Sequence, residues 1–295
     1  MSIKFFYLIF LVCPICLIIS SCSKVKKGEY DGKIVYVNGT NRIKFLDLKT
    51  LESGIIYTEN EIVAGILNIK KIDNNLVLFS FSEYGIEPTI KKLNLDNKTV
   101  EFYYSGENPF LIGDQLFLYE HKKELFILSL DQVSLKDTSV IKTKIADYQV
   151  NKRLANIVKL PDNSVIYNDP DDYLTKYDPV NKRKKKLSFK GYYPLFYNSN
   201  DNLLYCSTHV FRISDSSEEL VTIDIANNEK NDLGVYVSEN VVFIEPYNSL
   251  IYGNPTFSLK YGETTDLYIL NLNSLQEKKL ITDVSFSDAV YIGNE

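Results

Sequence analysis

The chain has 295 residues, with 33 Lys and Arg against 38 Asp and Glu, and its formal net charge at pH 7 is −5. Hydrophobic residues make up 45% and charged residues 24%, which is the balance of a globular protein and not of a disordered or collagen-like one. The acidic balance argues against nucleic acid as a partner, because phosphate binding needs a basic surface. The 2 His residues are too few for a His-rich metal site.

The N-terminus has the pattern of an export signal. A positive charge at Lys4 precedes an apolar run over residues 5–19, which contains Pro14 and is shorter than the ~20 residues of a membrane-spanning helix. Small residues then lead to a cysteine, Cys22. The resulting motif, ISSC at 19–22, resembles the lipobox of bacterial lipoproteins.

This resemblance implies that residues 1–21 are a cleaved signal peptide and that Cys22 carries a diacylglycerol and an amide-linked fatty acid such as palmitate. More than one acyl chain gives stable anchoring, and residues 22–31 suit a short polar tether. The expected location is the cell envelope, and Ser23 after the cysteine resembles the outer-membrane class of Gram-negative lipoproteins. An ordinary cleaved signal, with an incidental Cys22, is the alternative.

The other cysteines do not form a predicted disulfide framework. Cys13 and Cys16 lie within the segment that is expected to be removed. Once Cys22 is acylated, Cys206 has no partner, and the fold must be stable on packing alone.

The rest of the chain reads as a repeat of strands. Short runs rich in Ile, Val, Tyr and Phe are bounded by Asn, Asp, Gly and Ser, which is strand composition with turn residues between. An apolar run ending in an aromatic or another apolar residue is followed each time by a run with a polar residue near its end. The second runs are IKFLDL at 43–48, IKKLNL at 90–95, LFILSL at 125–130, LTKYDP at 174–179, LVTIDI at 220–225 and LYILNL at 267–272. An interval of about 45 residues with four strands per unit matches a propeller blade.

Two further runs complete each unit. A charged third run fits an outer strand, because charge prevents edge-to-edge pairing, and a mainly apolar run leads into the next unit. At the ends, GKIVYV at 32–37 lacks an inner strand before it, and VSFSDAVYI at 284–292 has no blade after it. We therefore predict an all-β, six-bladed β-propeller of four-stranded antiparallel blades over residues 32–295, closed by pairing of the C-terminal strand with the N-terminal blade. A seven-bladed ring with one degenerate unit, or a pair of β-sandwiches, is the alternative.

One unit carries a family resemblance. The stretch SLIYGNPTFSLKYGETTDLYILNLNSLQEKKLITD at 249–283 is similar to the repeat of TolB-type six-bladed propellers. Both consist of one strand, a second strand of the type "dlYvlnl" and then a basic strand. The resemblance implies the same fold.

No catalytic residue, metal or cofactor is predicted. The chain contains no GxSxG, P-loop, HExxH or GxGxxG motif. His121 and His209 fall in expected turns, and the pair of Cys206 with His209 lacks a third, orienting group nearby.

Three other features have a functional and a structural interpretation. The acidic stretch NDPDD at 168–172 offers oxygen ligands for Ca²⁺, but an Asp/Pro turn is the preferred reading. The basic run KRKKK at 182–186 suits anionic headgroups or an acidic partner, but an exposed outer strand is preferred. Tyr192 and Tyr193, on an expected inner strand, are candidate ligand-binding residues near the mouth of the channel, with core packing as the alternative.

These observations favour a binding or scaffolding module, held at the membrane by its lipid, with a protein or peptide partner and no chemistry of its own. The alternative is a propeller enzyme, such as a lactonase-like hydrolase with a metal in the channel. Its polar residues on the mainly apolar inner strands would be Asn68, Asn156, Glu245 and Asp288. A sensor domain of an export or signalling system is a third hypothesis, which fold analogy alone does not separate from the first.

Overall fold

The computed structural model describes eleven stretches of the chain. These are residues 28–59, 64–83, 86–112, 115–120, 124–129, 142–147, 156–208, 218–237, 241–258, 262–286 and 288–293. The expected signal peptide 1–21, the acylation site Cys22, and both His121 and His209 lie outside them. Within the described stretches, no helix has the length and apolar character needed to cross a membrane.

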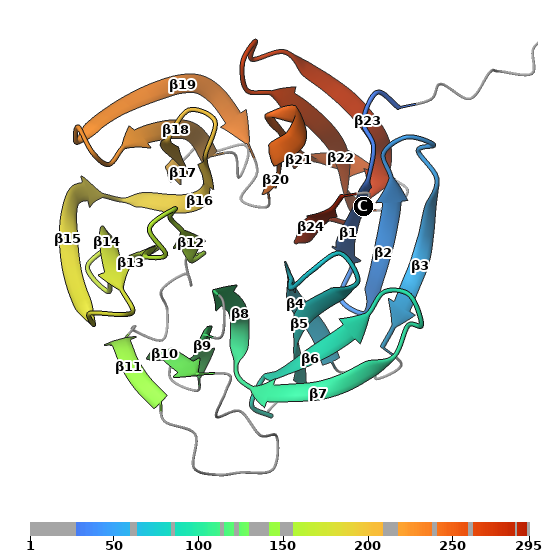
Figure 1. The fold of residues 1–295 in the computed structure, drawn as a ribbon. Coiled ribbons are helices and arrows are strands. Elements are labelled where there is room, and N and C mark those ends of the chain that lie inside the picture. Colours follow the sequence, from blue (N-terminus) through green and yellow to red (C-terminus); the bar gives the residue numbers. More distant parts are fainter. Residues whose placement is uncertain are drawn as a thin grey trace, which may run out of the picture.

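The described residues form six four-stranded antiparallel sheets that stand around a ring (Figure 1). We call them sheets 1 to 6 in chain order. In each sheet the four strands lie side by side, in order from the innermost strand at the ring centre to the outermost strand (Figure 1). The inner strands of sheets 1 to 6 are β24 (Ala289–Ile292), β4 (Ala64–Lys71), β8 (Glu107–Ile112), β12 (Val158–Lys159), β16 (Tyr192–Asn198) and β20 (Val241–Ile244). The second strands are β1 (Lys33–Asn38), β5 (Leu76–Glu83), β9 (Gln115–Glu120), β13 (Val165–Asn168), β17 (Leu203–Thr208) and β21 (Ser249–Ser258).

The outer half of each sheet completes the blade. The third strands are β2 (Arg42–Asp47), β6 (Thr89–Asn94), β10 (Glu124–Ser129), β14 (Tyr173–Asp178), β18 (Glu218–Asp224) and β22 (Gly262–Asn271). The outer strands are β3 (Ser53–Thr58), β7 (Val100–Ser105), β11 (Lys142–Asp147), β15 (Arg183–Lys190), β19 (Glu229–Val237) and β23 (Glu277–Val284). The prediction of an all-β propeller built from four-stranded antiparallel blades is confirmed.

Sheet 1 draws on both ends of the chain. Its inner strand β24 pairs antiparallel with β1, and Val290 lies opposite Val35. The backbone N–H of Val37 continues this contact with a 2.9 Å hydrogen bond to the carbonyl of Asp288. The predicted pairing of the C-terminal strand with the N-terminal blade is therefore confirmed.

The second strands are continuous apolar runs because each is covered on both faces. Along β1, Val35 and Val37 pack into a cluster shared with sheet 2, whereas Ile34 and Tyr36 pack into one shared with sheet 6. All four side chains are buried. Alternating side chains thus enter two different layers between sheets. Because neither face of the strand contacts solvent, polar and apolar residues do not alternate along it.

In the five sheets whose turn from third to outer strand the structure describes, the polar residue near the end of the third strand caps that turn. Asp47 Oδ1 accepts the backbone N–H groups of Lys49 and Thr50, at 3.0 and 2.9 Å. Four other turns repeat this geometry, with the acceptors Asn94, Asp178, Asp224 and Asn271. Backbone and side-chain hydrogen bonds from Asn227 hold the pKa of Asp224 below its usual range. The side chains that revealed the repeat therefore serve the turns.

The same five turns share a strained backbone position. The fourth residue after the capping side chain has a left-handed φ in each, at Leu51, Lys98, Lys182, Asn228 and Leu275. Such a φ is uncommon outside Gly and Asn, so the capping hydrogen bonds help to stabilise it.

Cys206 on β17 is a fully buried thiol with no disulfide partner among the described residues. Burial raises the pKa of its thiol well above the usual range, so the reactive thiolate is suppressed.

Candidate functional site

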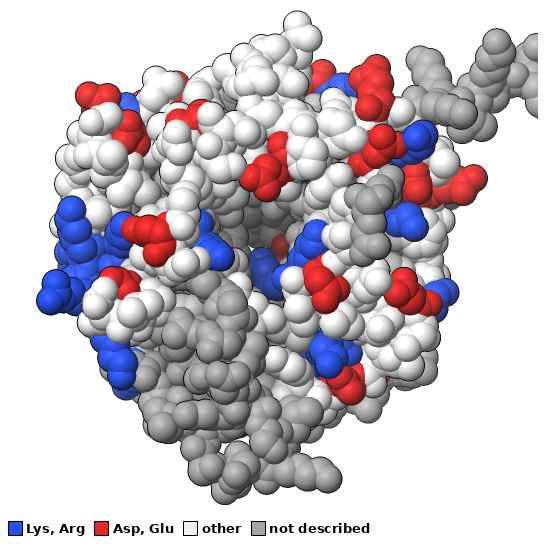
Figure 2. Space-filling view, in the orientation of Figure 1, with Lys and Arg blue, Asp and Glu red and all other residues white. Residues whose placement is uncertain are grey.

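A cavity of about 730 Å³ occupies the ring centre. Residues on or beside the inner strands of all six described sheets line it, and Figure 2 shows the hollow from one face of the ring. This volume lies within the range of ligand-binding cavities.

β-Bulges direct side chains into the cavity. In β4 the pairing with β5 skips Leu67, and in β16 the pairing with β17 skips Leu195. In β8 the bulge spans Asn108, whose φ is 51°. All three residues line the cavity, and Leu67 is 43% exposed. A bulge leaves its extra residue unpaired and re-aims the side chain, which explains how leucines come to face the cavity.

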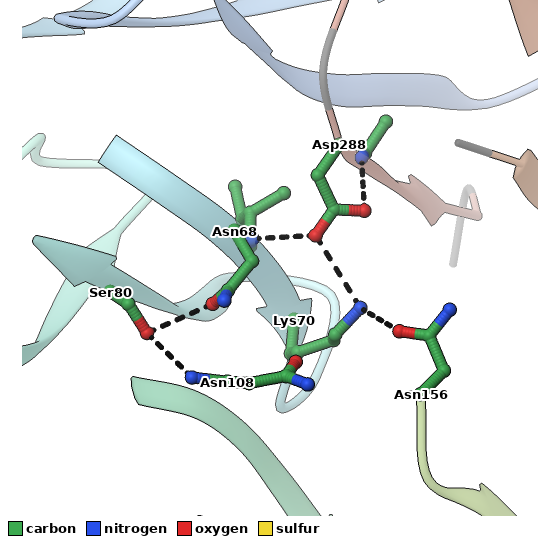
Figure 3. Close-up of polar contacts among 8 residues, drawn as sticks. Asn68, Lys70, Ser80, Asn108, Asn156 and Asp288 are labelled. Carbon is green, nitrogen blue, oxygen red and sulfur yellow. Dashed lines mark hydrogen bonds and ion pairs between the residues drawn. The ribbon is translucent and has the colours of Figure 1, made fainter. Parts of the chain in front are cut away.

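One wall of the cavity is polar and is centred on Lys70 of β4 (Figure 3). The Lys70 ammonium lies 3.4 Å from Asp288 Oδ2 and 3.5 Å from Asn156 Oδ1. Asp288 Oδ2 also accepts the backbone N–H of Ile69 at 3.0 Å, and its Oδ1 accepts the N–H of Ala289 at 2.9 Å. One carboxylate therefore ties the start of β24 to sheet 2.

A second set of hydrogen bonds supports the same wall from behind. The hydroxyl of Ser80, which is fully buried on β5, donates to Asn68 Oδ1 at 2.9 Å. It accepts the backbone N–H of Asn108, also at 2.9 Å (Figure 3). Ser80 thus connects two cavity-lining residues that belong to different sheets.

The opposite wall is apolar and comes from sheets 5 and 6. Phe196 of β16 stacks on Phe243 of β20, with ring centroids 4.3 Å apart, and on Tyr205 of β17 at 4.7 Å. Phe196, Phe243 and their neighbours Pro194 and Val241 line the cavity. Stacked rings bury large apolar areas and form a stiff surface. The cavity therefore has one apolar and one hydrogen-bonding wall.

The predicted polar residues of the inner strands do gather here. Asn68, Asn156, Glu245 and Asp288 all line the cavity, but Glu245 lies in a short 3-10 turn after β20, where it accepts a hydrogen bond from Ser199 at 2.7 Å. Lys70, which also lines the cavity, was not among the predicted residues. Its spacing of two from Asn68 places both on one face of a strand, and this signal could have revealed it.

Oxygen atoms at this wall already have donors. Both carboxylate oxygens of Asp288 and the side-chain oxygens of Asn68 and Asn156 accept hydrogen bonds within the protein. Among the residues that the structure describes, no three His, Cys, Asp or Glu side chains gather as a metal site would require.

The two tyrosines predicted to bind a ligand occupy different places. Tyr193 lines the cavity. Tyr192 packs edge-on against Phe189, with ring centroids 6.3 Å apart, in the layer between sheets 4 and 5. Its carbonyl accepts a 2.7 Å hydrogen bond from the amide of Asn168. The alternation of side chains along β16 separates the pair.

The acidic stretch 168–172 forms a turn between β13 and β14. Asp169 Oδ1 accepts the N–H groups of Asp171 and Tyr173, and its Oδ2 lies 2.9 Å from the Lys186 ammonium. Partial burial alone would raise the pKa of Asp169, but the hydrogen bonds from Lys186 and the backbone outweigh it and lower the pKa. This carboxylate is thus engaged within the chain.

No family model and no curated protein matches the sequence. Among solved structures, TolB from Acinetobacter baumannii is 15% identical and matches with a TM-score of 0.66, over 90% of this chain and 68% of that chain. A protein of unknown function from Bacteroides caccae is 13% identical, with a TM-score of 0.57 over 89% of this chain and 99% of that chain. A putative TolB from Agrobacterium tumefaciens is 9% identical, with a TM-score of 0.56 over 88% and 94%. The chain therefore has a TolB-like β-propeller fold. Sequence identities this low show a shared fold but not a shared function.

Proposed function

We propose that the protein is a six-bladed, lipid-anchored β-propeller that acts as a binding or scaffolding module in the bacterial cell envelope, with a protein or peptide as its partner. The observation that carries this proposal is the central cavity with its apolar wall and its hydrogen-bonding wall. The TolB-like fold and the lipobox-like ISSC at 19–22 support the place in the envelope.

A polypeptide segment fits the two walls. Its apolar side chains would contact Leu195, Phe196 and Phe243, while its backbone and polar side chains would face Lys70 and the nearby amides. Tyr193 would add an aromatic contact with a hydrogen-bonding end. The polar wall is held in place before binding, which reduces the entropy lost on association.

Replacing Leu67 by Asp is expected to abolish partner capture without unfolding the protein. The side chain is partly exposed in the cavity, so the carboxylate remains solvated in the free protein but meets the bound segment. The measurement is recovery of one stoichiometric partner from detergent-solubilised envelopes, with the lipidated protein as bait. Ile86→Asp is the matched control, because Ile86 is 57% exposed in the connection between β5 and β6 of the same blade and does not line the cavity. Equal recovery by both variants would contradict a binding role for the cavity.

The anchor is tested separately with Cys22→Ala. Loss of the acylated thiol is expected to move the protein from the membrane fraction to the soluble fraction, because the acyl chains supply the membrane affinity. In an organism with two membranes, the unsubstituted protein is expected in the outer membrane. A Cys22→Ala protein that stays in the membrane fraction would overturn the lipid anchor.

A lactonase-like hydrolase is the second candidate. The observation that favours it is the gathering of Asn68, Asn156, Asp288 and Glu245 around one cavity, since a divalent cation in such a channel binds oxygen atoms. Elemental analysis of the purified protein distinguishes the two proposals. A stoichiometric divalent metal that Asp288→Ala removes would favour the enzyme.

A further inference from the structure

The segment of residues 28–32, which we call the clamp segment, is fastened to sheet 1 just before β1. The N–H of Gly28 donates to the carbonyl of Lys49 at 2.6 Å, and the Lys49 ammonium lies 2.8 Å from Asp31. The carbonyl of Gly32 accepts the N–H of Leu48 at 2.9 Å. Lys49 belongs to the turn between β2 and β3, so the chain reaches the ring at that end of the strands.

The clamp segment is also fastened to sheet 6. The ring of Tyr30 packs edge-on against Tyr247, with centroids 5.1 Å apart, and the Tyr247 hydroxyl accepts the N–H of Asp31 at 2.7 Å. Glu29 lies 3.1 Å from Lys278 at the start of β23. The attachment thus spans the junction where the first and last parts of the chain meet.

All these contacts lie on one face of the ring, which we call the tether face. It carries the turns from inner to second strands and from third to outer strands. Their described members include residues 48–52, 72–75, 95–99, 161–164, 179–182, 199–202, 225–228, 245–248 and 272–276. The opposite face carries the turns from second to third strands, such as residues 39–41.

A basic patch lies on the tether face at the other side of the ring. It consists of Lys182, Arg183 and Lys185, at the start of β15, and β15 stands across the ring from β1 (Figure 1). All three side chains are exposed and form no ion pair among the described residues, although Asp178 lies opposite Arg183 in the pairing of β14 with β15. The alternate lysines are engaged, because Lys184 donates to the carbonyl of Ile145 and Lys186 pairs with Asp169. Figure 2 shows the blue side chains gathered at this part of the rim.

We propose that the tether face lies flat on an anionic membrane surface and is held there at two opposite points, the acylated Cys22 and the basic patch. The inference rests on the proposed lipid anchor. Cys22 precedes Gly28 by six residues, which span at most about 20 Å, so the clamp segment stays close to the lipid. A lipid chain combined with a polybasic patch is a recognised pair of membrane signals. The opposite face is then left open to the partner.

The distribution of charge favours a ring that lies flat on the membrane over a ring that stands on its edge. The formal net charge of −5 gives the whole molecule no general attraction to anionic lipids, so the attraction must be local. Among the described residues on the side of the ring remote from the tether, Lys182, Arg183 and Lys185 supply exposed cations that form no ion pair. High salt should therefore release that side of the ring from the membrane, because exposed charges are screened over about 3 Å at 1 M salt. Neutral lipids should release it as well, because they offer the cations no opposite charge.

Energy transfer from the protein to a lipid-bound acceptor tests the orientation. A donor dye is placed on Val180→Cys, on the tether face beside the patch, or on Thr40→Cys, on the opposite face of sheet 1. The buried thiol of Cys206 remains unlabelled in the folded protein. The full lipidated protein is reconstituted in vesicles containing phosphatidylglycerol, or in vesicles of phosphatidylcholine alone as the control.

In anionic vesicles we expect about twofold greater transfer from position 180 than from position 40, since strands of six residues separate the two faces by about 20 Å. Neutral vesicles, 1 M salt, or the triple variant Lys182→Glu, Arg183→Glu, Lys185→Glu should remove this difference. Transfer from position 40 that equals or exceeds transfer from position 180 in anionic vesicles would overturn the orientation. Failure of the anchor itself is distinguished by the Cys22→Ala fractionation, which does not depend on orientation.

Discussion

Val290→Asp is expected to remove most of the stability of the propeller. Val290 is 8% exposed on the inner strand that closes sheet 1, and its side chain packs with Val37 and Ile292 in the cluster between sheets 1 and 2. A carboxylate there would be largely buried among apolar side chains, which costs at least about 3 kcal/mol in addition to the lost packing. Natural domains have free energies of unfolding of only about 5–15 kcal/mol. The midpoint of urea unfolding, followed by far-ultraviolet circular dichroism, should therefore fall steeply.

Val180→Asp is the matched control for this experiment. The chemical change is identical, but Val180 is 80% exposed in the turn before β15, so its effect should stay within about 0.5 kcal/mol. Removal of residues 289–295 should resemble Val290→Asp, because sheet 1 would lose its inner strand. If Val290→Asp were as stable as Val180→Asp, pairing of β24 with β1 would not contribute to closure.

The repeat could be predicted from the sequence because it depends on the chemistry of side chains that are close together in the chain. The capping side chains Asp47, Asn94, Asp178, Asp224 and Asn271 recur at every described turn from a third to an outer strand, where each accepts backbone N–H groups of its turn. The closure was also predictable, because the missing inner strand before β1 and the surplus strand at the C-terminus complement each other. These inferences need only the period and the order of the strands.

The cavity was only partly accessible because β-bulges alter the alternation of side chains. A strict period of two cannot predict that Leu67 and Leu195 face the ring centre, since each is an extra residue in its strand. The sequence pattern does not predict the bulge at Asn108 either. Asp288 was selected as a polar residue of an inner strand, but its partner Lys70 was not, because a lysine on a strand ordinarily indicates exposure.

Tyr192 shows a second limit. Neighbouring residues on a strand point to opposite faces, so only one of Tyr192 and Tyr193 can line the cavity. Sequence alone gives the alternation but not its phase relative to the ring axis. The phase is set by packing between sheets, here by Phe189 against Tyr192. Ligand binding at Tyr193 remains a prediction.

Ser80→Ala is expected to lower the free energy of unfolding by about 2 kcal/mol and to weaken partner capture as well. The variant leaves the Asn108 N–H, in a buried residue, without the hydroxyl that accepts it, and it removes the donor to Asn68 Oδ1. An unsatisfied buried group costs about 1–3 kcal/mol. Because Asn68 and Asn108 both line the cavity, a loss of their connection also loosens the polar wall.

Ser188→Ala is the matched control, since the Ser188 hydroxyl also donates to an asparagine of a neighbouring sheet, Asn228, at 2.5 Å, but in an exposed position. Water replaces that hydrogen bond, so the change in free energy should stay within about 0.5 kcal/mol. Urea unfolding and recovery of the envelope partner are measured for both variants. Equal stability of the two would show that Ser80 contributes no net stabilisation. A destabilised Ser80→Ala protein that captures its partner undiminished under native conditions would separate the polar wall from binding, and would leave the apolar wall of sheets 5 and 6 as the recognition surface.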